Sequence, residues 1–396
     1  MSRKILLWLV SAIHAIFLIV VSYYWHKQPF LYDEELTLLR ISSYFKRLVL
    51  HIDNKPDLSK YLFIDISWEK MLVDKYDEYG FPIGKEAVTS RPVLLEFFKR
   101  VSNFDEGPKF IVCDIFFDVP TDYDRDLEKE INKFDNILCV SLYDSQYDTA
   151  FYPVLDVPTA TTSFETSEGV FLKTKLVFAD SIKTLPVQLY EYTEGKKLRA
   201  DDHFNWSTFR INLNSFVVDH GVRNYDLFES EITRKVYLSE LLLLDDESIE
   251  KIVKDKLIFI GDYEDNDLVE TIYGDLPGPI ILVNIYNSII NKANQINALF
   301  IVYLLLGYFF VSYICFSNDS IFDILTDKLS SKYKINADLL SFGGYLLYFF
   351  LMSFISYLIF DFILTILLFS LYMEIFERLK TMFEKYVLVH FFKLNS

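Results

Sequence analysis

The sequence reads KFIVCDIFF over residues 109–117, an apolar run in which β-branched and aromatic residues surround one aspartate. A short run of this kind between turn residues is typical of a strand that is buried on both faces. Similar runs occupy residues 61–66 (YLFIDI) and residues 136–140 (NILCV). Three buried strands are therefore predicted, and the segments between them decide the fold.

Both intervening segments have the periodicity of a helix. Thr89 or Ser90 can cap a helix whose first turn accepts Pro92, and its apolar residues recur at helical spacing up to Val101. Residues 125–134 form the next helical pattern. The order β-α-β-α-β predicts an α/β fold with a mostly parallel sheet flanked by helices, because right-handed crossovers place the helices over the sheet.

A later part of the same region adds one more strand and a long helix. Residues 256–262 (KLIFIGD) predict a buried strand. After Pro277-Gly278-Pro279, residues 280–296 have the pattern of an amphipathic helix that runs straight into the next hydrophobic segment. We therefore expect a rigid lever between this domain and a membrane.

Hydrophobic segments at both ends of the chain predict about four transmembrane α-helices. Residues 1–25 form a short cytoplasmic N-terminus and a first span. The alternative is a cleavable signal peptide, but the apolar run is longer than the apolar region of such a peptide. Residues 298–316 form a second span. Residues 339–374 make either two spans or one long helix; a turn at 356–361 is expected, because Asp361 is costly at mid-membrane. Lysine and arginine then place residues 317–338 as a cytoplasmic loop and residues 375–396 as a cytoplasmic amphipathic tail.

The charge of the chain is concentrated in residues 26–297, the predicted extracytoplasmic domain. The formal net charge of the whole chain is −17. Residues 25–297 alone carry 48 Asp and Glu against 30 Lys and Arg, a net of −18. Binding to phosphates needs clustered Lys and Arg, so nucleic-acid partners are excluded. We expect an acidic, well-solvated surface outside the membrane.

Motifs of enzymes and metal sites are missing from the sequence. It has no GxSxG, HExxH, P-loop or GxGxxG pattern, and its six histidines are scattered, so we expect no enzyme, no cofactor and no metal site. Three cysteines cannot make a disulfide scaffold. Cys113 and Cys139 fall on strands that we expect to be neighbours, and the sequence leaves open whether they are bonded or are two buried thiols.

Four charged residues form the candidate ligand-binding site: Asp65, Arg91, Asp114 and Asp262. The three aspartates stand at the carboxyl ends of predicted strands, the edge at which open α/β sheets bind ligands. Arg91, at the predicted start of a helix, can pair with one of them or hold an anionic ligand through two hydrogen bonds. The alternative is structural: a buried ion pair, or carboxylates that accept backbone N–H bonds.

The order of these segments resembles the CHASE domain of type 2, a family of extracytoplasmic sensory modules associated with cyclases and histidine kinases. The pieces that carry the resemblance are residues 63–66 (FIDI), 79–84 (YGFPIG), Ser90-Arg91, 111–117 (IVCDIFF), Asp122, Asp124, Asp126, Leu127, 256–262 (KLIFIGD), Asp267, Thr271, 277–279 (PGP) and Asn284. The resemblance covers roughly residues 30–297 and extends to the succession of one anchor, a sensory domain and terminal spans. Members of the family often carry an output domain after the last span, whereas about 22 residues follow it here.

The function expected from the sequence is that of a membrane-anchored extracytoplasmic sensor. It would bind an unknown small-molecule or envelope ligand and relay a signal through its transmembrane helices to a separate cytoplasmic effector. The alternative is a non-signalling envelope scaffold or protein-interaction platform. The resemblance implies a multi-pass protein of a bacterial inner membrane, in contact with lipid, with its large domain outside the cytoplasm; a homodimer is left open.

Overall fold

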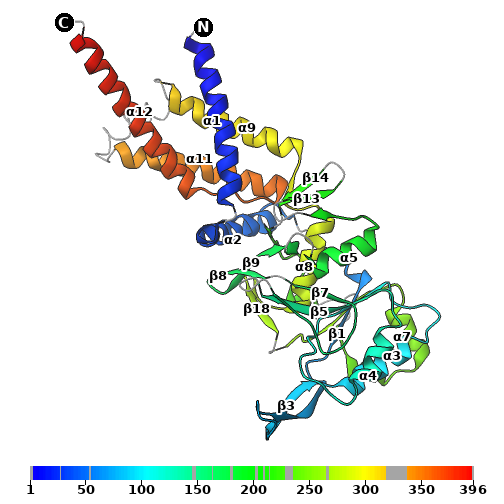
Figure 1. The fold of residues 1–396 in the computed structure, drawn as a ribbon. Helices are drawn as coiled ribbons and strands as arrows, with labels where there is room; N and C mark the ends of the chain where they lie inside the picture. Colours follow the sequence, from blue (N-terminus) through cyan, green and yellow to red (C-terminus); the bar gives the residue numbers. More distant parts are fainter. Residues whose placement is uncertain are drawn as a thin grey trace. The chain divides into compact units, whose positions relative to one another are not determined.

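A computed structural model describes most of the chain and divides it into two units (Figure 1). The helical unit comprises residues 1–52 and 293–396, and the α/β unit comprises residues 53–292. The described residues are 3–26, 28–52, 55–144, 149–162, 164–178, 182–200, 204–207, 210–213, 215–227, 235–264, 267–317 and 337–394.

The α/β unit is built on a mostly parallel sheet, which confirms the predicted fold class. Its strands lie side by side in the order β16 (Lys235–Tyr237), β1 (Tyr61–Asp65), β17 (Leu257–Gly261), β4 (Phe110–Cys113) and β5 (Ile137–Asp144), all parallel. β7 (Thr159–Thr161) pairs with β5 in parallel and β6 (Thr149–Phe151) in the antiparallel sense. The late strand β17 thus separates β1 from β4, although these two follow each other in the predicted β-α-β order.

Helices cover both faces of this sheet (Figure 1). One face packs on α5 (Leu185–Glu194) and α8 (Gly278–Ile290) through residues such as Phe63, Val112 and Phe259. The other packs on α3 (Arg91–Val101), α4 (Asp124–Ile131), α6 (Leu238–Leu242) and α7 (Asp246–Val253) through the alternate residues, such as Ile64 and Ile258. Each fully buried side chain of this size stabilises the fold by about 1.5–3 kcal/mol. Both faces are apolar, so the strands read as continuous hydrophobic runs.

Smaller strands decorate this core. They are the hairpin of β2 (Lys70–Tyr76) and β3 (Pro82–Thr89), the sheet of β8 (Glu165–Ser167), β9 (Val170–Lys175) and β15 (Ser215–Val217), the hairpin of β18 (Leu268–Thr271) and β19 (Gly274–Pro277), the pair β10 (Val177–Phe178) and β11 (Ile182–Lys183), and β12 (Arg199–Ala200), β13 (Phe204–Ser207) and β14 (Arg210–Leu213). The short 3-10 helices are η2 (Leu58–Lys60) and η3 (Asn224–Leu227).

The predicted lever is wrong in length and in character. Helix α8 ends at Ile290, and Asn291 caps it, instead of continuing to residue 296. Lys292 and Asn294 then adopt left-handed backbone conformations, with φ of 61° and 59°, which no continuous right-handed helix contains. All residues of α8 up to Ile289 are buried, so the helix is a core element instead of an amphipathic one.

The helical unit contains three helices that are long and apolar enough to cross a membrane, counted over the described residues. They lie in α1 (Arg3–Trp25), α9 (Ala298–Phe316) and α11 (Ala337–Phe360); the unit also holds η1 (Pro29–Leu31), α2 (Tyr32–Leu48), β20 (Gln295–Ile296) and α12 (Leu367–Leu394). The prediction of about four spans is therefore wrong by one. Helix α12 begins at Leu367 and reaches its first charged residue at Glu374, so its apolar stretch is too short for a bilayer core of ~30 Å. The expected cytoplasmic loop, residues 317–338, lies almost entirely outside the described residues.

A break at Asp361 separates α11 from α12, at the end of the range expected for a turn. Asp361 has φ of 54°, and its carboxylate accepts a bond from the Lys46 ammonium of α2 at 2.5 Å. The Glu34 side chain, also on α2, accepts bonds from the Ile366 and Leu367 N–H groups at the start of α12. Helix α2 therefore supplies polar partners for a carboxylate and for a helix end that lie in an otherwise apolar unit.

Candidate functional site

The parallel sheet brings the three predicted aspartates to one edge. Asp65 ends β1 beside Gly261 of β17, so Asp262 follows directly next to it. Ile260 of β17 pairs with Cys113 of β4, which places Asp114 on the other side of β17. We call this edge, with Asp65, Asp114, Asp262 and their contacts, the carboxylate edge.

Asp65 is fully buried and has a charged partner that the sequence did not reveal. Its Oδ2 lies 2.6 Å from the ammonium of Lys235, which comes from the neighbouring strand β16 and whose side chain is 6% exposed. Its Oδ1 accepts hydrogen bonds from the Ser67 backbone N–H at 2.8 Å and from the Ser67 hydroxyl. The structural alternative, a buried ion pair, therefore describes the environment of this residue.

Asp262 belongs to the same network. Its Oδ1 lies 2.7 Å from the Ser67 hydroxyl and accepts the Glu264 N–H at 3.0 Å, and its Oδ2 lies 3.3 Å from the Lys70 ammonium. The Ser67 hydroxyl is thus within hydrogen-bonding reach of both carboxylates and links the ends of β1 and β17. Each of the two aspartates thus has a lysine within 3.3 Å, and the Glu264 carboxylate lies further off, 3.9 Å from the Lys235 ammonium.

Asp114 faces a different partner, Asp267, near the first turn of α8. The Gly278 N–H donates to the Asp267 carbonyl at 2.9 Å, and the Asp267 carboxyl lies so close to Gly278 that a Cβ there would overlap it. Burial raises the pKa of Asp267 to about 7, and the negative charge of Asp262 adds to the effect. Burial and the neighbouring Asp267 also raise the pKa of Asp114 well above its usual value. Both carboxyls are therefore harder to ionise in the folded chain than in water.

Arg91 bonds none of the three aspartates among the described residues, and the bonds that it makes are structural. Its Nε contacts the Asp124 carboxylate at 3.3 Å, its Nη1 donates to the Thr89 carbonyl at 2.9 Å and its Nη2 to the Val119 carbonyl at 3.3 Å. The guanidinium also stacks 4.5 Å from the centre of the Phe117 ring. It therefore joins the start of α3 to the segment that precedes α4.

We expect Arg91→Met to lower the free energy of unfolding by about 2 kcal/mol, because it removes a buried donor from the Asp124 carboxylate and from the partly buried Thr89 and Val119 carbonyls. Arg100→Met is the matched control: Arg100 also bonds one carboxylate, of Asp246, and two carbonyls, of Leu242 and Leu244, but its side chain is 20% exposed, against 1% for Arg91. Urea unfolding of the full chain measures both. Equal losses for the two variants would contradict the role assigned to burial.

Sequence reasoning missed Lys235, Ser67 and Lys70 as members of the network. Lys235 opens a strand of three residues with no clear alternation, so nothing in its neighbourhood marked it. Ser67 and Lys70 do follow the end of β1 directly, where polar residues at a sheet edge were to be expected. Among the described residues, no cluster of three or more His, Cys, Asp or Glu side chains could hold a metal ion.

Comparison with known families decides the identity of this fold. A sequence model of the CHASE2 domain matches residues 73–316, more than half of the chain. The chain belongs to the CHASE2 family. CHASE2 domains are extracytoplasmic sensory domains, which confirms the resemblance seen in the sequence. No curated protein and no solved structure matches the chain.

The CHASE2 domain of this chain has an open pocket of 560 Å³ at the edge opposite the carboxylates, which we call the exit pocket. Its lining includes Lys55 and Pro56, near the start of the α/β unit, and Ile290 and Asn291, near its end. Its volume lies in the range of small-molecule sites, about 300–1,000 Å³. A ligand here would touch both segments by which the domain is tethered.

Polar groups line the exit pocket. The Tyr61 hydroxyl donates to Asn287 Oδ1 at 2.9 Å, and burial raises the pKa of Tyr61, which keeps it a neutral donor. Asn287 is buried, and its Nδ2 has no hydrogen-bond partner among the described residues. The charged lining residues are balanced, three lysines (Lys55, Lys60 and Lys109) and three carboxylates (Asp57, Glu194 and Asp255). Such a lining suits a small ligand with groups of both charges.

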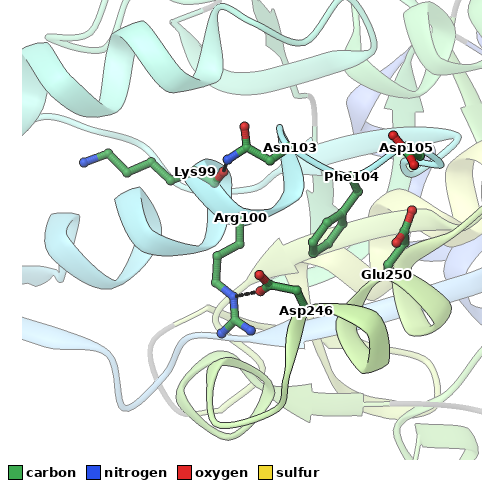
Figure 2. Close-up of a pocket in the computed structure, with 7 residues that line it drawn as sticks. All are labelled: Lys99, Arg100, Asn103, Phe104, Asp105, Asp246 and Glu250. Atoms are coloured by element: carbon green, nitrogen blue, oxygen red, sulfur yellow. Dashed lines mark hydrogen bonds and ion pairs between the residues drawn. The ribbon is translucent and has the colours of Figure 1, made fainter.

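A second pocket of the CHASE2 domain, of 350 Å³, lies between α3 and α7 (Figure 2). Its main cation, Arg100, is already bonded to Asp246 at 2.6 Å and to the Leu242 and Leu244 carbonyls. Figure 2 shows the Arg100 side chain directed towards Asp246 instead of into open space. Residues of this pocket are therefore matched controls for the lining residues of the exit pocket.

Proposed function

We propose that this chain is a multi-pass sensor of a bacterial inner membrane. Its CHASE2 domain, outside the cytoplasm, binds a small polar ligand and passes the change through the transmembrane helices to a separate cytoplasmic effector. The observation that carries the proposal is the extent of the family match. It runs from the β2–β3 hairpin to Phe316, the last residue of α9, so the family unit includes a candidate span together with the sensory domain.

Helix α8 is the element best placed to couple ligand and membrane. Its first turn meets Asp267, and its last turn lines the exit pocket, where Asn287 binds Tyr61 of β1. It is enclosed by core side chains over its length, so we expect it to shift as one body. Only residues 291–297 separate it from α9 in the chain. Coupling further requires that the ligand prefer one of two arrangements of this helix.

The experiment uses the full chain in lipid nanodiscs with Trp8→Cys and Phe309→Cys, in a background with Cys315→Ser. The rings of Trp8 and Phe309 lie 5.0 Å apart, so the two cysteines report the packing of α1 against α9. Glycine, acetate and ethylamine serve as zwitterionic, anionic and cationic probes. We expect glycine to raise the melting temperature by several degrees and to change the rate of disulfide formation at least twofold.

Two charge reversals localise the response. Lys109→Glu in the exit pocket should abolish the effect of glycine, whereas Lys99→Glu in the pocket of Figure 2 should keep it. A melting temperature that rises without any change in the disulfide rate would support a binding scaffold and contradict the relay. No response to any probe would contradict a small charged ligand in this pocket.

A further inference from the structure

The β2–β3 hairpin exposes large hydrophobic side chains to an unusual extent. Six of them within residues 68–83 are 57–77% exposed: Trp68, Leu72, Tyr76, Tyr79, Phe81 and Ile83. Single exposed apolar residues are ordinary, but a contiguous group of this kind marks an interaction surface. In Figure 1 the hairpin projects from the rest of the α/β unit.

The hairpin also has free edges and one free face. It is a two-stranded sheet of its own, with no further strand paired to it among the described residues. Leu72 pairs with Ala87 and Asp74 with Lys85, so these four side chains share a face, and all four are exposed. The alternate residues Met71, Val73 and Val88 are partly or fully buried. An isolated hairpin is marginally stable in water, so covering the exposed face would stabilise it.

We propose that two copies of this chain associate through the exposed side chains of the β2–β3 hairpin and of the adjoining Trp68, with the face of Leu72, Asp74, Lys85 and Ala87 at the centre. The exposed parts of the six hydrophobic side chains amount to on the order of 700 Å² per copy, taking ~150–250 Å² for a large side chain. A stable protein interface needs ~800 Å² per partner. The hairpin therefore supplies most of the area that a dimer requires.

The charges of the hairpin select a second copy as the occupant. We place the two-fold axis at the Asp74–Lys85 pair of each hairpin; contacts across such an axis are reciprocal, so Asp74 faces the partner's Lys85 and Lys85 faces the partner's Asp74. Residues 70–89 carry three lysines and four carboxylates, a net of −1, within a segment whose net charge is −18. Two acidic domains can thus approach each other at the hairpin without the repulsion that they would meet elsewhere.

The test is the mass of the full chain in detergent, measured by analytical ultracentrifugation over a range of concentrations. We expect the wild-type chain to be a dimer and Leu72→Asp to weaken the dimer at least tenfold. Leu243→Asp is the matched control, because Leu243 is 86% exposed but lies on the turn after α6. A monomeric wild-type chain, or a dimer that Leu72→Asp leaves unchanged, would overturn the proposal.

Charge reversal separates contacts between copies from contacts within one hairpin. Asp74→Lys alone and Lys85→Glu alone place like charges across the interface, and each should weaken the dimer at least tenfold. Mixing the two single variants restores both opposite pairs between copies, although each hairpin keeps its like charges. We expect the mixture to form heterodimers of near wild-type affinity; a mixture that stays monomeric would overturn the proposed geometry.

Discussion

Asp65→Ala should lower the free energy of unfolding of the α/β unit by about 3–5 kcal/mol. The substitution removes the carboxylate 2.6 Å from the Lys235 ammonium, which is 6% exposed and cannot recover its solvation. The next carboxylate, of Glu264, lies 3.9 Å away and is partly exposed. The change also removes the acceptor for the Ser67 N–H, so it opens the link between β1 and β17. Urea unfolding of the full chain, followed by circular dichroism, measures the loss.

A double variant distinguishes a buried charge from lost packing. Asp65→Ala with Lys235→Met removes both charges, and we expect it to recover at least half of the loss, because an apolar pair is tolerated where a lone charge is not. Lys70→Met is the surface control: Lys70 contacts Asp262 at 3.3 Å but is one-third exposed, so we expect a loss below about 1 kcal/mol. Strictly additive losses in the double variant would contradict the coupling of Asp65 and Lys235.

The sequence predicted the parts of the fold that depend on local patterns of apolar and helix-starting residues. Strands β1, β4 and β17 and helix α3 follow from short apolar runs and from Ser90 and Pro92 at a helix start. The insertion of β17 between β1 and β4 could not be predicted in this way, because strand pairing depends on contacts between distant segments. The β2–β3 hairpin was not predicted either. Residues 78–84 have the composition of a turn, but the flanking strands bury few side chains and lack a clear apolar alternation.

The sequence predicted where the aspartates of the candidate site lie, but it did not predict which residues bond to them. Asp65, Asp114 and Asp262 do meet at one edge, since the carboxyl ends of parallel strands coincide there. Arg91 does not join them, because its guanidinium is bonded to the Asp124 carboxylate and to the Thr89 and Val119 carbonyls. The cation that pairs with Asp65 comes from β16, far along the chain, and a lysine in so short a strand carries no sequence signal. Whether any of the four residues binds a ligand stays a prediction.

Asp267→Asn should stabilise the α/β unit above neutral pH and leave it nearly unchanged at pH 4. The pKa of Asp267 is raised from 3.8 to about 7 in the folded chain, so the folded state binds the proton more tightly than the unfolded state does. Stability contributed by this group is therefore complete below pH 4 and is lost as the pH rises towards 7. Its loss amounts to about 2–4 kcal/mol at 1.4 kcal/mol per unit. An asparagine does not titrate, so the variant does not lose this stability as the pH rises.

The slope of stability against pH tests this assignment directly. We expect the wild-type chain to lose stability between pH 4 and pH 7 relative to Asp267→Asn, and the difference to be constant above pH 8. Asp275→Asn, an exposed carboxylate on β19, is the matched control and should leave the slope unchanged. Since Asp114 lies in the field of Asp267, removing that charge should also let Asp114 ionise more readily, so the remaining slope should shift to lower pH. A variant less stable than wild type at pH 8 would show instead that the Asp267 carboxylate supports the first turn of α8 in its charged form.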